Sequence, residues 1–174
     1  MAEVNYKIGS LSSDILRGRV RAFCKSQSTS AYNDYMFDLF AQKGGIFCAA
    51  LIDGEVIGCT ASVPVEGNVV LGDLLGVTEW LVSNGYYVEE TDYPALTFVS
   101  PEHQGKGISN EMHRLKFQHQ IDKGYKQSIN FAFETKSAYD YYHHLGNLHD
   151  TGLPNYMGQK IYLTPLKDAL LSVS

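Results

Sequence analysis

The sequence lacks the features by which membrane and secreted proteins are recognised. No apolar run reaches the ~18 residues that a membrane-spanning helix requires. The N-terminal stretch from Met1 to Lys7 lacks the basic segment and the apolar run of a secretory signal. Linkers, internal repeats and low-complexity tails are missing as well. We therefore expect one domain over residues 1–174, in the cytoplasm and without a membrane partner.

Cysteine is scarce, with Cys24, Cys48 and Cys59 as the only three residues and no metal-binding spacing among them. The dipeptide Asp53-Gly54 predicts a tight hairpin turn. Counting outward from this turn places Cys48 directly opposite Cys59, with Cα atoms ~5.5 Å apart. A disulfide is geometrically feasible at that distance, but two packed thiols are favoured in a cytosolic protein.

Neither the histidines nor the charge indicates a metal or nucleic-acid protein. His113 and His119 are off the i, i+4 spacing of a helical zinc pair, so we expect no metal site. The net charge of −5 argues against nonspecific nucleic-acid binding, which needs a clustered basic surface. The same charge is compatible with a cationic amine as substrate.

The chain does contain the composition and the patterning of a globular domain. Hydrophobic residues make up 44% and charged residues 19% of the sequence. Strands alternate with helices in the second half, which predicts the α/β (α+β) class, with helices around a mixed sheet. The expected strands cover 5–11, 46–52, 55–63, 86–90, 96–100 and 125–133, with two more in 147–164; the expected helices cover 14–27, a stretch from 29, 73–83, 107–123 and 136–145.

The most informative stretch runs from Leu96 to Ser109, where a strand stops at Pro101 and a glycine turn opens into a helix. A helix N-terminus presents unpaired backbone N–H groups and the positive end of the dipole. Glycines just before it let a phosphate approach those groups. The P-loop and Rossmann patterns are excluded by their glycine spacing. The stretch is therefore a candidate pyrophosphate site.

Two motifs resemble those of the GNAT N-acetyltransferase superfamily. The first fits the coenzyme A loop Gln/Arg-x-x-Gly-x-Gly/Ala, with Ser at the last place, as Gln104-Gly105-Lys106-Gly107-Ile108-Ser109. The second is similar to the later motif Asn-x-x-Ala-x-x-x-Tyr-x-x-Leu-Gly-Phe. It matches at Ala138, Tyr142, Leu145 and Gly146, with Thr135 in place of Asn and Asn147 in place of Phe.

The resemblance implies a GNAT-like, mostly antiparallel central sheet whose strands splay apart at the cofactor. It also implies transfer of an acetyl group from acetyl-CoA to an amine, with the pantetheine arm pairing with backbone groups near Phe98 and Val99. The pyrophosphate would rest on the N–H groups of the loop. The residues implied to bind acetyl-CoA are Phe98, Val99, Gln104, Gly105, Lys106, Gly107, Ile108, Ser109, Thr135 and Ala138.

Catalysis by a GNAT-like site needs a base for the amine and an acid for the leaving thiolate. Tyr142 stands at the family's acid position, on the helix face that it shares with Ala138. Asp92 and Glu90 precede the cofactor strand and are the candidate bases, with Glu134 as a third option. The alternative interpretation of these carboxylates is that they are solvated loop acids.

The acceptor is not encoded in either motif. Aromatic residues near acids suit a small cationic amine, and a protein lysine or N-terminus is the alternative. A non-catalytic acyl-CoA-binding or regulatory module on the same fold is the alternative to an enzyme. Nucleic-acid binding is a third hypothesis, which predicts salt-dependent retention on DNA. A homodimer is common in the family and is one expected state.

Overall fold

In this computed structural model the chain folds into two compact units, and strand β4 (Thr91–Val99) and helix α4 (Ile108–Asp122) each contribute residues to both. The first unit comprises residues 1–63 and 94–116, and the second comprises 64–93 and 117–174. None of the helices described is long and apolar enough to cross a membrane. The structure describes residues 3–12, 15–27, 34–66, 68, 75–133, 148–155 and 158–173.

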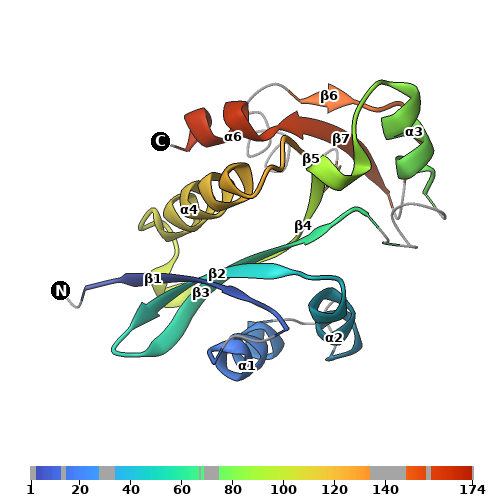
Figure 1. The fold of residues 1–174 in the computed structure, drawn as a ribbon. Helices are drawn as coiled ribbons and strands as arrows, with labels where there is room; N and C mark the ends of the chain where they lie inside the picture. The colour runs from blue at the N-terminus through green and yellow to red at the C-terminus, as the bar shows by residue number, and fades with distance from the viewer. Residues whose placement is uncertain are drawn as a thin grey trace. The chain divides into compact units, whose positions relative to one another are not determined.

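The first unit is an antiparallel set of strands covered by helices. Its strands pair in the order β1-β2-β3, and Figure 1 shows the first two helices on one face of them. The opposite face packs against the first turns of α4 through Ile108 and Met112. The elements besides those two shared ones are β1 (Asn5–Ser10), α1 (Arg17–Gln27), α2 (Asp34–Gln42), β2 (Ile46–Ile52) and β3 (Glu55–Pro64).

The turn between β2 and β3 is the hairpin turn that the sequence predicts. Asp53 and Gly54 have φ values of 49° and 82°, the left-handed conformation that such two-residue turns require. The interior residues of both strands are buried. Strands covered on both faces read as continuous apolar runs instead of alternating patterns, which explains the composition of this hairpin.

The register of the hairpin differs from the expected one. Ala50 lies opposite Gly58 but Leu51 lies opposite Val56, so Ile57 is an extra residue, or β-bulge, in β3. The bulge shifts the pairing beyond it by one residue. The prediction that Cys48 lies directly opposite Cys59 is therefore wrong, because counting outward from the turn assumes an unbroken ladder.

The shift sends the two thiols to different neighbours. Cys48 lies opposite Thr60 and packs in the cluster under α4 with Met112, whereas Cys59 hydrogen-bonds with Cys24 of α1. All three cysteines are free and buried, as the packed-thiol interpretation predicts. Burial raises the pKa of the Cys48 thiol to about 12, so this thiol is unreactive at neutral pH.

The second unit holds the remaining strands and helices. The first residues of β4 pair in parallel with β5, at Thr91–Gln127 and Asp92–Ser128, while β5 pairs antiparallel with β7, and β7 with β6. The strand order β1-β2-β3-β4-β5-β7-β6 confirms a mixed, mostly antiparallel sheet. The elements are α3 (Val77–Ser83), β5 (Gln127–Phe133), β6 (His149–Asp150), β7 (Gln159–Pro165) and α6 (Leu166–Ser172).

One expectation for this unit is wrong, and one helix was not expected. The segment 86–90 is not a strand, because Val88–Glu90 forms a 3₁₀ turn, which is held by the Thr91 hydroxyl donating to the Tyr87 carbonyl at 2.8 Å. The sequence also did not predict α6, whose Leu166 and Ala169 are buried against Phe117. The helix expected over 73–83 begins at Val77 instead, because Gly76, with φ of 69°, is its N-cap. The expected helix 136–145 lies outside the described residues.

Gly45 tests how tightly the first unit is packed. A Cβ there would lie 2.7 Å from Leu11 Cδ1 and 2.8 Å from the Phe40 carbonyl oxygen, whereas one at Gly18 in α1 would meet nothing within 4 Å. We expect Gly45→Ala to lower the free energy of unfolding by about 1–3 kcal/mol. Gly18→Ala should raise it by about 0.5–1 kcal/mol. Urea unfolding checks both; equal stability of the two variants would contradict the packing.

Candidate functional site

The loop between β4 and α4 has the backbone that the glycine motif predicts. A 3₁₀ turn, Pro101–His103, follows the strand, and Gly105 and Gly107 then adopt φ values of 72° and 77°. L-residues rarely adopt this conformation, so both positions favour glycine. A Cβ at either glycine would meet nothing within 4 Å. The space beside the loop is therefore open, and a ligand could approach the backbone there.

The side chains of the loop hold the loop itself in shape. The Gln104 amide donates to the Val99 carbonyl at 3.0 Å, and the Lys106 amine donates to the Glu102 carbonyl at 2.8 Å. At the start of the loop, the Ser100 backbone N–H donates to the Ile57 carbonyl at 2.9 Å. Gln104 and Lys106 thus brace the turn, and the groups left to meet an anion are backbone N–H groups.

Helix α4 begins directly after Gly107, and its first intrahelical hydrogen bond runs from the Glu111 N–H to the Gly107 carbonyl at 3.1 Å. The N–H groups ahead of Glu111 have no acceptor within the helix, and the helix dipole makes this end positive. The carboxylate of Glu111 would oppose an anion here. Arg114 offsets that charge through two hydrogen bonds, at 2.8 and 2.6 Å.

The helix is placed by its buried face. Ile108 and Met112 are buried in the cluster beneath α4, and Val99 at the end of β4 packs against the same cluster. A Cβ at Gly58 would lie 3.1 Å from Met112 Cε, so glycine at this position lets the helix approach β3. The first unit thereby gathers the expected coenzyme A residues Phe98, Val99, Gln104, Gly105, Lys106, Gly107, Ile108 and Ser109 on one strand, one loop and one helix start.

The second expected motif falls in the segment 134–147. Thr135, Ala138 and Tyr142 lie outside the described residues, and so does Glu134.

Both candidate bases belong to the second unit, in different surroundings. Asp92 is 2% exposed, and its two carboxylate oxygens accept hydrogen bonds from the Gln120 amide and the Ser128 hydroxyl. Glu90 is partly exposed and its carboxylate lies 2.7 Å from the Lys126 amine. The solvated-acid interpretation therefore does not describe Asp92, which connects β4 to α4 and β5.

A polar cluster in the first unit was missed by the sequence analysis. His113, on the buried side of α4, has its Nε2 atom 3.3 Å from the Thr97 hydroxyl of β4. Burial, and then the charge of Lys116, lower the pKa of His113 to about 3. The imidazole is therefore neutral at physiological pH. The available signal was the spacing of His113 and Lys116, which lie three residues apart and therefore on one side of the helix, next to the apolar residues Met112 and Phe117.

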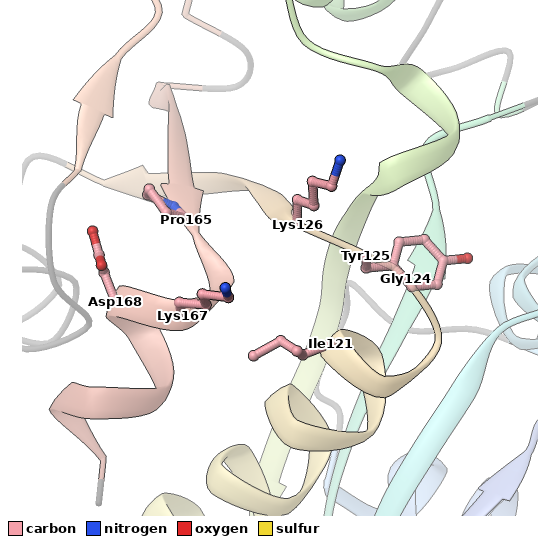
Figure 2. A pocket seen from close by; sticks show the side chains of 7 residues that line it. All are labelled: Ile121, Gly124, Tyr125, Lys126, Pro165, Lys167 and Asp168. Carbon is pink, nitrogen blue, oxygen red and sulfur yellow. The ribbon is translucent and has the colours of Figure 1, made fainter.

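A cavity of about 510 Å³ lies in the second unit, between the last turn of α4, the segment that enters β5 and the start of α6. Figure 2 shows the side chains that line it. Lys126, which lines the cavity, forms an ion pair with Glu90, and its amine nitrogen lies 5.9 Å from the centre of the Tyr87 ring. None of the residues from Gln104 to Ser109, which form the glycine loop and the start of α4, lines this cavity, so it is not the candidate site. Its lining residues are Ile121, Gly124, Tyr125, Lys126, Pro165, Lys167 and Asp168.

The loop and helix α4 lie within the part of the chain that matches a known protein family. The profile of the "Acetyltransferase (GNAT) family" matches residues 14–146, which include residues of both units. A comparison with curated proteins finds no match.

Solved structures share the fold at low sequence identity. The N-acetyltransferase YhbS from Escherichia coli, in complex with CoA, has 16% identity and a TM-score of 0.62 over 98% of this chain and 86% of that one. The CoA-dependent acyl-homoserine lactone synthase BjaI has 11% identity and a TM-score of 0.67, over 98% and 88%. PaiA N-acetyltransferase from Thermoplasma acidophilum, with coenzyme A, has 11% and 0.55, over 92% and 99%.

The low pKa of His113 predicts a specific pH dependence of stability. The unfolded chain binds a proton at this residue below a pH of about 6.5, whereas the folded protein does so only near 3. The free energy of unfolding should therefore fall as the pH is lowered from 6.5 towards 3, by up to about 1.4 kcal/mol per pH unit from this residue.

His113→Gln removes the titrating group and keeps a polar atom near the Nε2 position. Urea unfolding of both proteins between pH 4 and 7 measures the difference in slope, with the flatter dependence expected for the variant. Identical slopes would mean that His113 binds its proton at the same pH in the folded and the unfolded protein, which would contradict the low pKa.

Proposed function

Because the chain belongs to the GNAT acetyltransferase family, we propose that it transfers an acetyl group from acetyl-CoA to a primary amine. The observation that carries this proposal is the open glycine loop leading directly into α4. The acceptor class is a small cationic amine or an amine of a protein or peptide. We further propose that residues 1–174 act as one domain, since the family match includes residues of both units.

The proposed seat for the pyrophosphate is the backbone of the loop and of the first turn of α4. The N–H groups from Gly105 to Ser109 supply donors, and the helix dipole supplies positive potential. The pairing of Glu111 with Arg114 reduces repulsion at this end of the helix. Binding through backbone groups also explains why Gln104 and Lys106 are free to brace the loop.

In the proposed reaction a neutral amine attacks the thioester carbonyl, so that a C–N bond forms and the C–S bond breaks. A backbone N–H on β4 near Phe98 and Val99 would stabilise the oxyanion. Glu90 or Asp92 would receive the proton of the amine, and Tyr142 would protonate the thiolate. Of the two carboxylates, Glu90 is the more accessible, while both oxygens of Asp92 already accept hydrogen bonds in the interior.

The proposal also names the acyl group that coenzyme A carries. Among proteins of similar fold, YhbS and PaiA are described with coenzyme A, and BjaI with isopentyl-CoA. These likenesses support coenzyme A as the carrier and make the length of the acyl chain a question for experiment. Acetyl-CoA is proposed because the matching family is described as acetyltransferases.

Gly107→Ala tests the loop. The substitution strains a residue with φ of 77° and adds a Cβ where the phosphate is proposed to lie. We expect CoA binding, measured by calorimetry, to weaken at least about tenfold. Gly85→Ala is the matched control, since Gly85 has φ of 79°, open surroundings and a position just after α3. Equal loss in both variants, or no binding by the wild-type protein, would overturn the proposed site.

Tyr142→Phe tests the proposed acid. Removing the hydroxyl should lower turnover, measured as thiol release with a panel of amines and lysine peptides, by about 10²-fold or more. The affinity for CoA should change far less. Unchanged turnover would remove Tyr142 from the mechanism. Tight CoA binding by the wild-type protein without turnover on any amine would favour the non-catalytic module.

A further inference from the structure

A chain of three polar side chains in the first unit links β3, β4 and α4. The hydroxyls of Thr60 and Thr97 lie 3.0 Å apart, and the Thr97 hydroxyl lies 3.3 Å from His113 Nε2. The Thr60 hydroxyl also donates to the backbone carbonyl of Leu96 at 3.2 Å. The loop motif and the proposed proton transfers assign no task to Thr60, Thr97 or His113.

The three side chains join two interior residues through one accessible residue of β4. Thr60 is fully buried and His113 is 4% exposed, whereas Thr97 is exposed. A buried polar group that loses its partner costs about 1–3 kcal/mol. The interior members therefore favour one position of Thr97, the position in which both hydrogen bonds form.

The segment of β4 around Phe98 is held at both ends. On one side the Leu96 carbonyl accepts from Thr60, and on the other the Val99 carbonyl accepts from the Gln104 amide at 3.0 Å. The residues between these two carbonyls are those proposed to meet the pantetheine arm. The low pKa of His113 keeps the imidazole uncharged, so its bond to Thr97 does not change with protonation near neutral pH.

We propose that Thr60, Thr97 and His113 are positioning residues that hold the backbone of β4 from Leu96 to Val99 in the geometry that binds the pantetheine arm of the acyl donor. The inference rests on the proposed function, because it assumes that this strand segment receives coenzyme A. The inference assigns separate roles to two parts of the site. The glycine loop binds the phosphates, and the Thr60–Thr97–His113 chain shapes the strand that the arm follows.

Thr97→Val and Thr97→Ser separate the hydroxyl from the shape of the side chain. Calorimetry would compare the affinity for CoA with that for adenosine 3′-phosphate 5′-diphosphate, which carries the nucleotide and phosphates but not pantetheine. Thr97→Val removes the hydroxyl that hydrogen-bonds with Thr60 and His113, and CoA binding should weaken about tenfold as a result. Binding of the nucleotide should stay within about twofold. Thr97→Ser should bind both ligands as the wild-type protein does.

Amide hydrogen exchange of the free protein provides a second measurement that needs no ligand. Exchange in the segment from Leu96 to Val99 should be faster in Thr97→Val than in the wild-type protein, and unchanged in Thr97→Ser. Faster exchange throughout the first unit would instead indicate general destabilisation and would overturn the positioning role.

The outcomes distinguish the inference from the proposed function. If the wild-type protein binds CoA and Thr97→Val binds it equally well, the positioning role is wrong and the proposed function stands. If Thr97→Val weakens CoA and the nucleotide to the same extent, the hydroxyl does not act on the pantetheine arm, and the inference again fails alone. If the wild-type protein binds the nucleotide but gains nothing from pantetheine, both the role of β4 and the proposed transfer fail.

Discussion

The close approach of helix α4 to strand β3 is the constraint on which the candidate site depends. A Cβ at Gly58 would lie 3.1 Å from Met112 Cε and 3.4 Å from Ile108 Cγ2. The helix can therefore pack this closely on β3 because residue 58 is glycine. Ile57, the extra residue of the bulge, packs in the same apolar cluster beneath the helix. The position of the helix start, and of the N–H groups proposed to hold phosphate, follows from this apolar contact.

Apolar packing alone would let the helix slide along the sheet, and buried polar groups oppose this. In the first unit, His113 is bonded to Thr97 of β4, and in the second, Gln120 near the end of the same helix donates to Asp92. A buried polar group without its partner costs about 1–3 kcal/mol, so each pair favours one register of helix and strand. These groups give the site precision that methyl groups would not.

Much of the fold was predictable from local chemistry. The Asp53-Gly54 turn and the glycine loop depend on backbone conformations that few residues other than glycine adopt readily. The sequence therefore predicts both of them, and the helix that follows the loop. The register of the hairpin and the helix α6 were not predictable in this way. The bulge at Ile57 and the burial of Leu166 depend on contacts with residues far away in the chain.

The sequence by itself determined the family motif, the open glycine turn and the start of α4, because a positive φ and a helix N-terminus are local properties of a few residues. Only the tertiary structure decided that Gln104 braces the loop, that Asp92 is enclosed by two donors and that His113 is neutral beside Thr97. Burial and hydrogen-bond partners set the chemistry of these polar side chains. Both are properties of the space around a residue, which distant segments of the chain create.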